Sequence, residues 1–392
     1  MNDKQSENSN KKQKIILGIL MLLAGLTALI GVFIMTDIGQ IIGVEKSTIV
    51  RYFEQSRSIM WFSFLLLVAA IILNVRKKLV KTWIMVTFGI LWSVAIISTK
   101  YLSPYILFRT LQYNSEFISI QDAHDYLQND DIVYVLDLNG VQRAYPRDYI
   151  WQAHIIGGDF GDENVIFTYC VMSNLPVPYK NDLEGKEVDF KVLAQANNNL
   201  LIWETNSGEI IQQITNTCEF SQQKLEPLPV LEMTWAGFKK AYPKGTVLHN
   251  EWDRPMEKIM NSLFSLEETW YGDRWMFNTV NLDDQRLPSK EQIIGLSDDL
   301  EGKQLAFTKS YIKKEGVINT SVGNKKVVLA YFPEFEAIAA FDRMVDGAEV
   351  EVSEIDFYGL TPENGKLERV FIYNSVLWAV WLDYFPDTEL IK

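Results

Sequence analysis

The chain has 392 residues, of which 48% are hydrophobic, and a net charge of −13. The first hundred residues carry 12 of the 37 Lys and Arg residues and 5 of the 50 Asp and Glu residues, which leaves 25 basic and 45 acidic residues after position 100. An acidic part of this kind repels nucleic acid and anionic lipid headgroups, so neither is an expected partner for it.

Three uncharged runs predict membrane-spanning helices at about residues 15–35, 58–75 and 82–99. No small-residue cleavage site follows the first run, which favours a retained span over a signal peptide. A basic turn at residues 76–81 separates the other two runs. The positive-inside rule therefore predicts a multi-pass protein of the cytoplasmic membrane, with a cytoplasmic amino terminus and an extracytoplasmic soluble part. The lipid bilayer is thus an expected partner, and anchoring is the expected role of a membrane domain at residues 1–100.

The remaining residues predict a β-rich α+β fold that follows a juxtamembrane connector at residues 101–130. Short runs with β-branched and apolar residues indicate strands at residues 132–137, 141–145, 165–170, 188–193, 200–204 and 210–214. A helix is expected at 147–153, and Thr234 is expected to cap another that ends at Ala241. Gly157, Gly158 and Gly161 predict a flexible loop before the third strand.

The soluble part also contains an internal repeat. An offset of 162 positions places Gly140 on Gly302 and Tyr149 on Tyr311, and a later offset of 143 places Trp235 on Trp378. Such self-similarity predicts two copies of one structural unit, at residues 131–248 and 300–392, and hence a two-lobed domain. The first copy is 19 residues longer, with the excess at about residues 197–220. Aromatic residues such as Trp270 and Phe277 predict an ordered crossover at residues 249–299.

The two copies differ at the residues that could carry chemistry. His154 aligns with Gly316 and Cys170 with Phe332, and Met172 follows two positions after the cysteine. Imidazole, thiolate and thioether together suit copper or another soft metal, and with a fourth ligand they suit zinc. One hypothesis is therefore a metal-binding or redox module centred on Cys170 and His154.

Three other interpretations of Cys170 stay open. With His154 as its base, the thiol could act as a nucleophile in a thiol enzyme. It could form a disulfide with Cys218, since the soluble part is expected outside the cytoplasm. It could also be a small core residue at the end of an apolar strand, as Phe332 suggests for the equivalent position.

A second candidate site lies in the insertion of the first copy. Asn199, Trp203 and Glu204 combine amide, aromatic and carboxylate groups, a set that suits a polar small-molecule ligand. In the alternative interpretation, the asparagines make a turn and Trp203 fills the core. No nucleotide-binding, Ser-His-Asp or metalloprotease signature is present, so the sequence leaves it open whether the chain is an enzyme.

Several short motifs in combination resemble a prokaryotic family of unknown function, DUF3179, from about residue 131 to the carboxyl terminus. They include Arg143-Ala144-Tyr145-Pro146, His154, Thr168-Tyr169-Cys170, Ser207-Gly208, residues 225–229, Thr234-Trp235 and residues 286–291. The resemblance also implies a second cysteine three residues after Cys170 and an aromatic residue at 211, where this chain has Ser173 and Ile211. Because the function of this family is unknown, the resemblance implies no particular activity. The sequence therefore predicts a membrane-anchored protein of this kind that is a metal or redox module, a non-catalytic ligand-binding or structural module, or a thiol enzyme, with an unspecified small-molecule or protein partner.

Overall fold

The structure is a computed structural model that describes residues 2–183, 185–250, 254–277, 279–298 and 300–392. It divides into two compact units. Unit 1 contains residues 1–107 with 193–196, and unit 2 contains residues 108–192 and 197–392.

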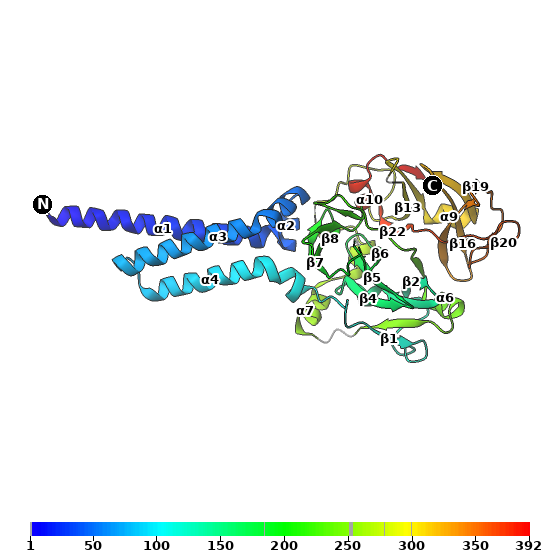
Figure 1. The fold of residues 1–392 in the computed structure, drawn as a ribbon, viewed down its shortest axis with the longest axis horizontal. Coiled ribbons are helices and arrows are strands. Elements are labelled where there is room, and N and C mark those ends of the chain that lie inside the picture. Colours follow the sequence, from blue (N-terminus) through cyan, green and yellow to red (C-terminus); the bar gives the residue numbers. More distant parts are fainter. Residues whose placement is uncertain (1, 184, 251–253, 278, 299) are drawn as a thin grey trace. The chain divides into compact units, whose positions relative to one another are not determined.

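Unit 1 is built from helices, which Figure 1 shows at the blue and cyan end of the chain. They are α1 (Asn2–Ile34), α2 (Asp37–Ile41), α3 (Lys46–Lys77), α4 (Thr82–Tyr101) and the π-helix η1 (Leu102–Leu107). Helix α1 packs against both α3 and α4. A hydrogen-bond chain joins the three, because Trp92 Nε1 donates to Ser63 Oγ at 2.8 Å and Ser63 Oγ donates to the Ala24 carbonyl at 3.0 Å.

Three of the described helices are long and apolar enough to cross a membrane, over Glu7–Ile34, Lys46–Lys77 and Thr82–Leu107. This confirms three candidate spans near the amino terminus. Both α1 and α3 extend beyond the predicted runs at residues 15–35 and 58–75. Large apolar side chains such as Leu22, Leu65 and Leu91 remain exposed on these helices, as expected for surfaces that face lipid.

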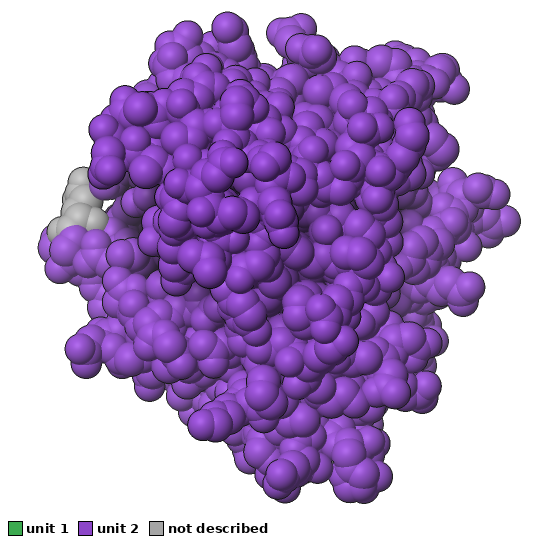
Figure 2. All heavy atoms as spheres, turned by 90° about the vertical axis from the view of Figure 1, so that its right-hand side faces the viewer, with its two compact units in different colours: residues 1–107, 193–196 green, residues 108–192, 197–392 purple. Residues whose placement is uncertain are grey.

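Unit 2 is rich in strands, and Figure 2 shows one of its faces with all heavy atoms as spheres. Its largest sheet has the order β1, β12, β3, β2 and β11. The bounds are β1 (Glu116–Ser119), β12 (Thr246–His249), β3 (Val141–Pro146), β2 (Ile132–Leu138) and β11 (Leu231–Thr234). A second sheet has the order β22 (Tyr373–Leu377), β13 (Gln292–Asp298), β14 (Lys303–Thr308) and β23 (Glu389–Ile391).

Two three-stranded sheets follow the same pattern as each other. One contains β4 (Ile155–Phe160), β5 (Glu163–Cys170) and β6 (Leu175–Lys180), and the other contains β15 (Val317–Val322), β16 (Lys325–Phe332) and β17 (Ala337–Asp342). The pair Ile155 and Thr168 in the first has its counterpart in Val317 and Ala330 in the second. Residues 162 positions apart thus hold the same place in the two sheets.

The remaining strands form one further sheet, with the order β10, β9, β8 and β7, and two hairpins. Strand β9 (Ile210–Gln212) pairs antiparallel with β8 (Asn199–Glu204) and with β10 (Thr217–Cys218). Strand β7 (Phe190–Ala196) precedes them in the chain. Two hairpins lie in the second half, made of β18 (Met344–Val345) with β19 (Ala348–Glu349) and of β20 (Leu360–Thr361) with β21 (Gly365–Lys366).

Six short helices lie in the described part of unit 2. They are α5 (Arg147–Ile150), α6 (Trp235–Ala241), α7 (Pro255–Leu263), α8 (Leu266–Tyr271), α9 (Lys309–Glu315) and α10 (Trp378–Tyr384). Helix α6 begins as predicted, because the Thr234 side chain accepts a hydrogen bond from Gly237 N. Helices α7 and α8 lie in the segment predicted to be a crossover, of which residues 251–253, 278 and 299 are outside the described part.

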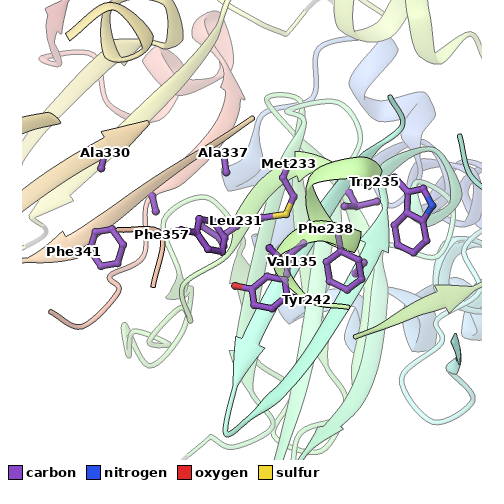
Figure 3. Packing of buried hydrophobic residues seen from close by; sticks show 14 of the residues in the cluster. Val135, Leu231, Met233, Trp235, Phe238, Tyr242, Ala330, Ala337, Phe341 and Phe357 are labelled. Carbon is purple, nitrogen blue, oxygen red and sulfur yellow. The ribbon is translucent and has the colours of Figure 1, made fainter. Parts of the chain in front are cut away.

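One large hydrophobic core contains residues from both halves of unit 2, where the first half is residues 131–248 and the second half is residues 300–392. Figure 3 shows Leu231, Met233 and Phe238 of the first half near Phe357 and Ala337 of the second. Full burial of side chains of this size stabilises a fold by about 1.5–3 kcal/mol each. The two halves therefore do not have wholly separate cores.

One local prediction was wrong. The segment with Gly157 and Gly158 is strand β4 rather than a flexible loop. A Cβ at Gly157 would overlap the carbonyl oxygen of Gln112, and one at Gly158 would lie 2.5 Å from Arg143 Nη1. These glycines permit the close approach of neighbouring chain segments inside a regular strand.

Candidate functional site

His154 is a buried residue that follows helix α5. Its side chain is 1% exposed, its Nδ1 lies 2.8 Å from the Tyr169 carbonyl oxygen, and its ring stands edge-on to Phe108 at 4.9 Å. Burial lowers the pKa of His154 to about 4, and the hydrogen bond to Tyr169 opposes that shift only in part. The imidazole is therefore neutral at neutral pH.

Cys170 ends strand β5 and is fully buried. Its Sγ donates a weak hydrogen bond to the Asn198 carbonyl at 3.6 Å. Burial raises the pKa of the Cys170 thiol, while hydrogen bonds from Ser173 act in the opposite direction. A thiol with a raised pKa is a poor nucleophile near neutral pH, because the thiolate is the reactive form.

The predicted partners of Cys170 are also buried. Met172 is 5% exposed and lies in the turn after β5, and Cys218 is fully buried in β10. Cys170 and Cys218 are both thiols, so the disulfide considered for them does not occur in the structure. Within the described ranges, no three His, Cys, Asp or Glu side chains are grouped to hold a metal ion.

Asn199 lies at the centre of a buried hydrogen-bond network. Its Nδ2 donates to Ser173 Oγ and to Gln213 Oε1, both at 3.1 Å. Its Oδ1 accepts from Gln212 Nε2 at 2.7 Å and from Ile214 N at 3.0 Å. These contacts occupy the amide of Asn199, and they stabilise the packing of β8 against the turn after β5.

Glu204 and Trp203 lie at the other end of β8. The Glu204 carboxylate accepts hydrogen bonds from Ser207 N, Ser207 Oγ and Asp189 N. Burial alone would raise the pKa of Glu204, but these hydrogen bonds outweigh it and lower the pKa. The carboxylate thus closes a turn of its own segment, and Trp203 is half-buried beside it.

Asn174 is a functional candidate that the sequence did not single out. It has a positive φ of 52° and is fully buried. Its Oδ1 accepts from the hydroxyls of Tyr134 at 2.9 Å and Tyr169 at 2.8 Å, and its Nδ2 donates to the Ser375 carbonyl at 3.0 Å. Asn174 therefore connects two buried tyrosines of the first half to strand β22 of the second.

A partly buried ion pair also joins the halves. Lys309 Nζ lies 2.6 Å from Glu232 Oε1, and the two side chains are 22% and 14% exposed. Burial would raise the pKa of Glu232, but the Lys309 charge and hydrogen bond lower it overall. The nearby Arg147 guanidinium stacks on Trp270, 4.1 Å from the ring centre.

An open cleft of about 620 Å³ lies between residues 216–229 of the first half and the sheets of the second. Its lining contains four basic and two acidic residues, namely Lys224, Lys325, Lys326, Arg369, Glu226 and Asp342. Phe371 and Tyr373 also line it and contact each other edge to face, with ring centres 5.0 Å apart. A net positive lining is unusual for a part of the chain with 25 basic and 45 acidic residues.

Two of the basic residues in this cleft are paired with carboxylates outside its lining, since Lys326 Nζ lies 3.6 Å from Glu349 Oε2 and Arg369 is paired with Asp137. Lys325 Nζ donates to the Ser297 carbonyl at 2.7 Å, which is a neutral acceptor. Arg369 Nη1 lies 3.4 Å from Asp137 Oδ2, and its Nη2 donates to the Phe357 carbonyl. The cleft was not predicted, because its residues come from segments that are far apart in the sequence, from Asn216 to Tyr373.

Comparison with known proteins agrees with the resemblance found in the sequence. The family model described as a protein of unknown function (DUF3179) matches residues 108–388, which is most of the chain. No curated protein and no solved structure matches the chain. The chain therefore belongs to the DUF3179 family.

Proposed function

We propose that this chain is a membrane-anchored, non-catalytic module that binds a small anionic molecule in the cleft beside Lys325. The observation that carries the proposal is the excess of basic over acidic residues in a cleft of about 620 Å³. Its volume falls in the range of small-molecule sites, and a few polar groups beside aromatic rings are typical of such sites. Carboxylate or phosphate groups are the chemistry that ammonium and guanidinium groups recognise.

The burial of Cys170 and His154 favours this proposal over a metal, redox or thiol-enzyme centre. Both side chains are at most 1% exposed, and both form hydrogen bonds with backbone carbonyl groups. The hydrogen bonds of Asn199 and Glu204 likewise favour a structural role for the insertion over ligand binding. A metal hypothesis remains testable through the Cys170→Ser variant.

The location and the two-lobed organisation belong to the same proposal. The charge distribution around the spans supports an extracytoplasmic unit 2, with the amino terminus in the cytoplasm. The matching registers of β4–β6 and β15–β17 support an origin of residues 131–248 and 300–392 as two copies of one unit. In this view, the cleft formed after duplication, where the longer first copy meets the second.

The proposal is tested by thermal unfolding of the full chain in detergent with a panel of small anions. The panel contains phosphate, sulfate, succinate and citrate, with a neutral sugar as reference. An anion present at a hundred times its Kd would stabilise the folded state by about 2.7 kcal/mol. We expect at least one anion, and not the sugar, to raise the unfolding temperature.

The variant Lys224→Ser/Lys325→Ser assigns the effect to the cleft. We expect it to abolish the shift, whereas Lys303→Ser/Lys366→Ser, which removes the same charge from exposed positions outside the cleft lining, should retain it. No shift with any anion, or equal loss in both variants, would contradict the proposal.

A further inference from the structure

We propose that helix α7 lies in the headgroup region of the bilayer, with Ile259 and Leu263 in contact with lipid. One side of α7 is attached to unit 2. The Glu257 side chain is 7% exposed, Gln152 Nε2 donates to the Glu257 carbonyl at 2.9 Å, and Phe264 stacks on Trp151 with ring centres 5.0 Å apart.

The other side of α7 presents apolar side chains to the surroundings. Ile259 is 50% exposed and Leu263 is 77% exposed. They are four positions apart in a helix and therefore share one face. The basic residues Arg254 and Lys258 belong to the same short segment. An apolar face beside basic residues is the pattern of a helix that lies in a membrane interface.

The connectivity of the chain brings α7 to the membrane. The third candidate span ends at Leu107, and Arg109 follows two residues later. Two residues of extended chain cover about 7 Å. Arg109 Nη1 lies 3.8 Å from Glu257 Oε1, so α7 contacts the first residues that leave the span.

The residues just after the third candidate span are hydrogen-bonded to the rest of unit 2, so they do not form a flexible linker. Leu111 N donates to the Ile155 carbonyl at 2.7 Å, and Gly157 N donates to the Leu111 carbonyl at 3.2 Å. Gln112 also bonds the backbone at Val188 and Phe190. The start of unit 2 is therefore fixed to the sheet containing β4, and the chain offers few free residues between α7 and the end of the third candidate span.

The aromatic composition of the last span supports this position. Tyr101 and Tyr105, which flank the start of η1, are 42% and 44% exposed and contact each other with ring centres 5.6 Å apart. Exposed tyrosines at the end of a span are typical of the membrane interface. Because unit 2 is acidic overall, we expect apolar contact rather than charge to hold α7 at the lipid.

The test places a fluorophore on α7 in the full chain. Leu263→Cys is labelled with nitrobenzoxadiazole, since the native Cys170 and Cys218 are fully buried. The labelled chain is placed in nanodiscs of zwitterionic phosphatidylcholine, one chain to a disc. The matched control is Lys314→Cys, near the end of α9, where the native side chain is 79% exposed.

We expect the label at 263 to emit at shorter wavelength, to be quenched by spin-labelled lipid, and to be quenched by iodide about threefold less than the label at 314. Equal iodide quenching at the two positions would overturn the proposal, as would a blue shift without quenching by lipid. Ile259→Cys repeats the test at the second apolar position, in case the first variant fails to fold.

Discussion

The sheets β4–β6 and β15–β17 have matching strand registers but different side chains around them. His154 and Gly316 occupy equivalent positions, and both have positive φ angles, of 53° and 78°. Their carbonyl groups accept equivalent hydrogen bonds, from Tyr169 N at 2.7 Å and from Tyr331 N at 2.8 Å. Glycine adopts this conformation without cost, and histidine does not. The first half thus tolerates backbone strain in order to bury an imidazole.

A second equivalent pair shows the same contrast. Asn174 and Glu336 both have φ angles of 52° in the turns after β5 and β16. Asn174 is fully buried among tyrosine hydroxyls, whereas the Glu336 side chain is 50% exposed and pairs with Lys313. Turns of similar backbone conformation are therefore buried between the halves at Asn174 and exposed to solvent at Glu336.

The largest expected effect comes from removing one partner of the ion pair between Lys309 and Glu232, which joins the two halves. Lys309→Met removes the largest favourable charge interaction of the Glu232 carboxylate, whose side chain is only 14% exposed, and we expect the folded state to lose about 3–5 kcal/mol. Urea unfolding of the detergent-solubilised chain measures this loss. The double variant Glu232→Leu/Lys309→Met is expected to recover most of it. A loss below about 1 kcal/mol in the single variant would mean that the pair behaves as a surface pair.

The comparison of Asn174 with Glu336 predicts the next largest effect. Asn174→Gly keeps a residue that accepts the positive φ but removes the partner of two tyrosine hydroxyls, at a cost of about 2–4 kcal/mol. Glu336→Gly makes the same change on the surface, where an exposed ion pair contributes at most about 1 kcal/mol. Similar losses in the two variants would contradict a special role for the buried turn.

The buried imidazole of the first half predicts a pH dependence that Gly316, at the equivalent position of the second half, cannot contribute. The pKa of His154 is about 4 in the folded chain and about 6.5 when unfolded, so the unfolded state binds more protons between these values. The stability contribution is present above pH 6.5 and is lost as pH falls toward 4, by about 1.4 kcal/mol per pH unit. Unfolding curves at several pH values should show a smaller slope for His154→Gly. An unchanged slope would place the proton uptake elsewhere.

Cys170 predicts the smallest change. Because Phe332 holds the equivalent place, the position needs an apolar side chain rather than a thiol, and Cys170→Ala should cost only about 1 kcal/mol of folding free energy. The measurement is again urea unfolding, with and without reductant. A loss of binding to every ligand found for the parent chain would show that the thiol has a role beyond packing.

Local signals in the sequence predicted a large part of the fold. The three apolar runs, the strand pattern and the capping of α6 by Thr234 all depend on residues close in the chain, and the structure agrees with them. The offsets of 162 and 143 also place residues that hold matching positions in the sheets. Short-range periodicity and self-similarity carried this information.

The sequence could not predict the features that depend on distant segments. Gly157 is needed because Gln112 approaches it, 45 positions earlier in the chain, and this made a strand look like a flexible loop. The role of Asn174 depends on Ser375, 201 positions later. The basic cleft combines residues around 224 with residues around 325 and 369. Only the tertiary structure brings these groups together.

We propose that Cys170 and His154 are core residues and that ligand binding takes place in the cleft. Metal analysis of the purified full chain, kept reduced and compared with Cys170→Ser, tests this most directly. We predict that the parent chain and Cys170→Ser both contain much less than one metal ion per chain and that both are folded. One metal ion per parent chain, lost in Cys170→Ser while the variant remains folded, would contradict the account and establish a metal centre at Cys170.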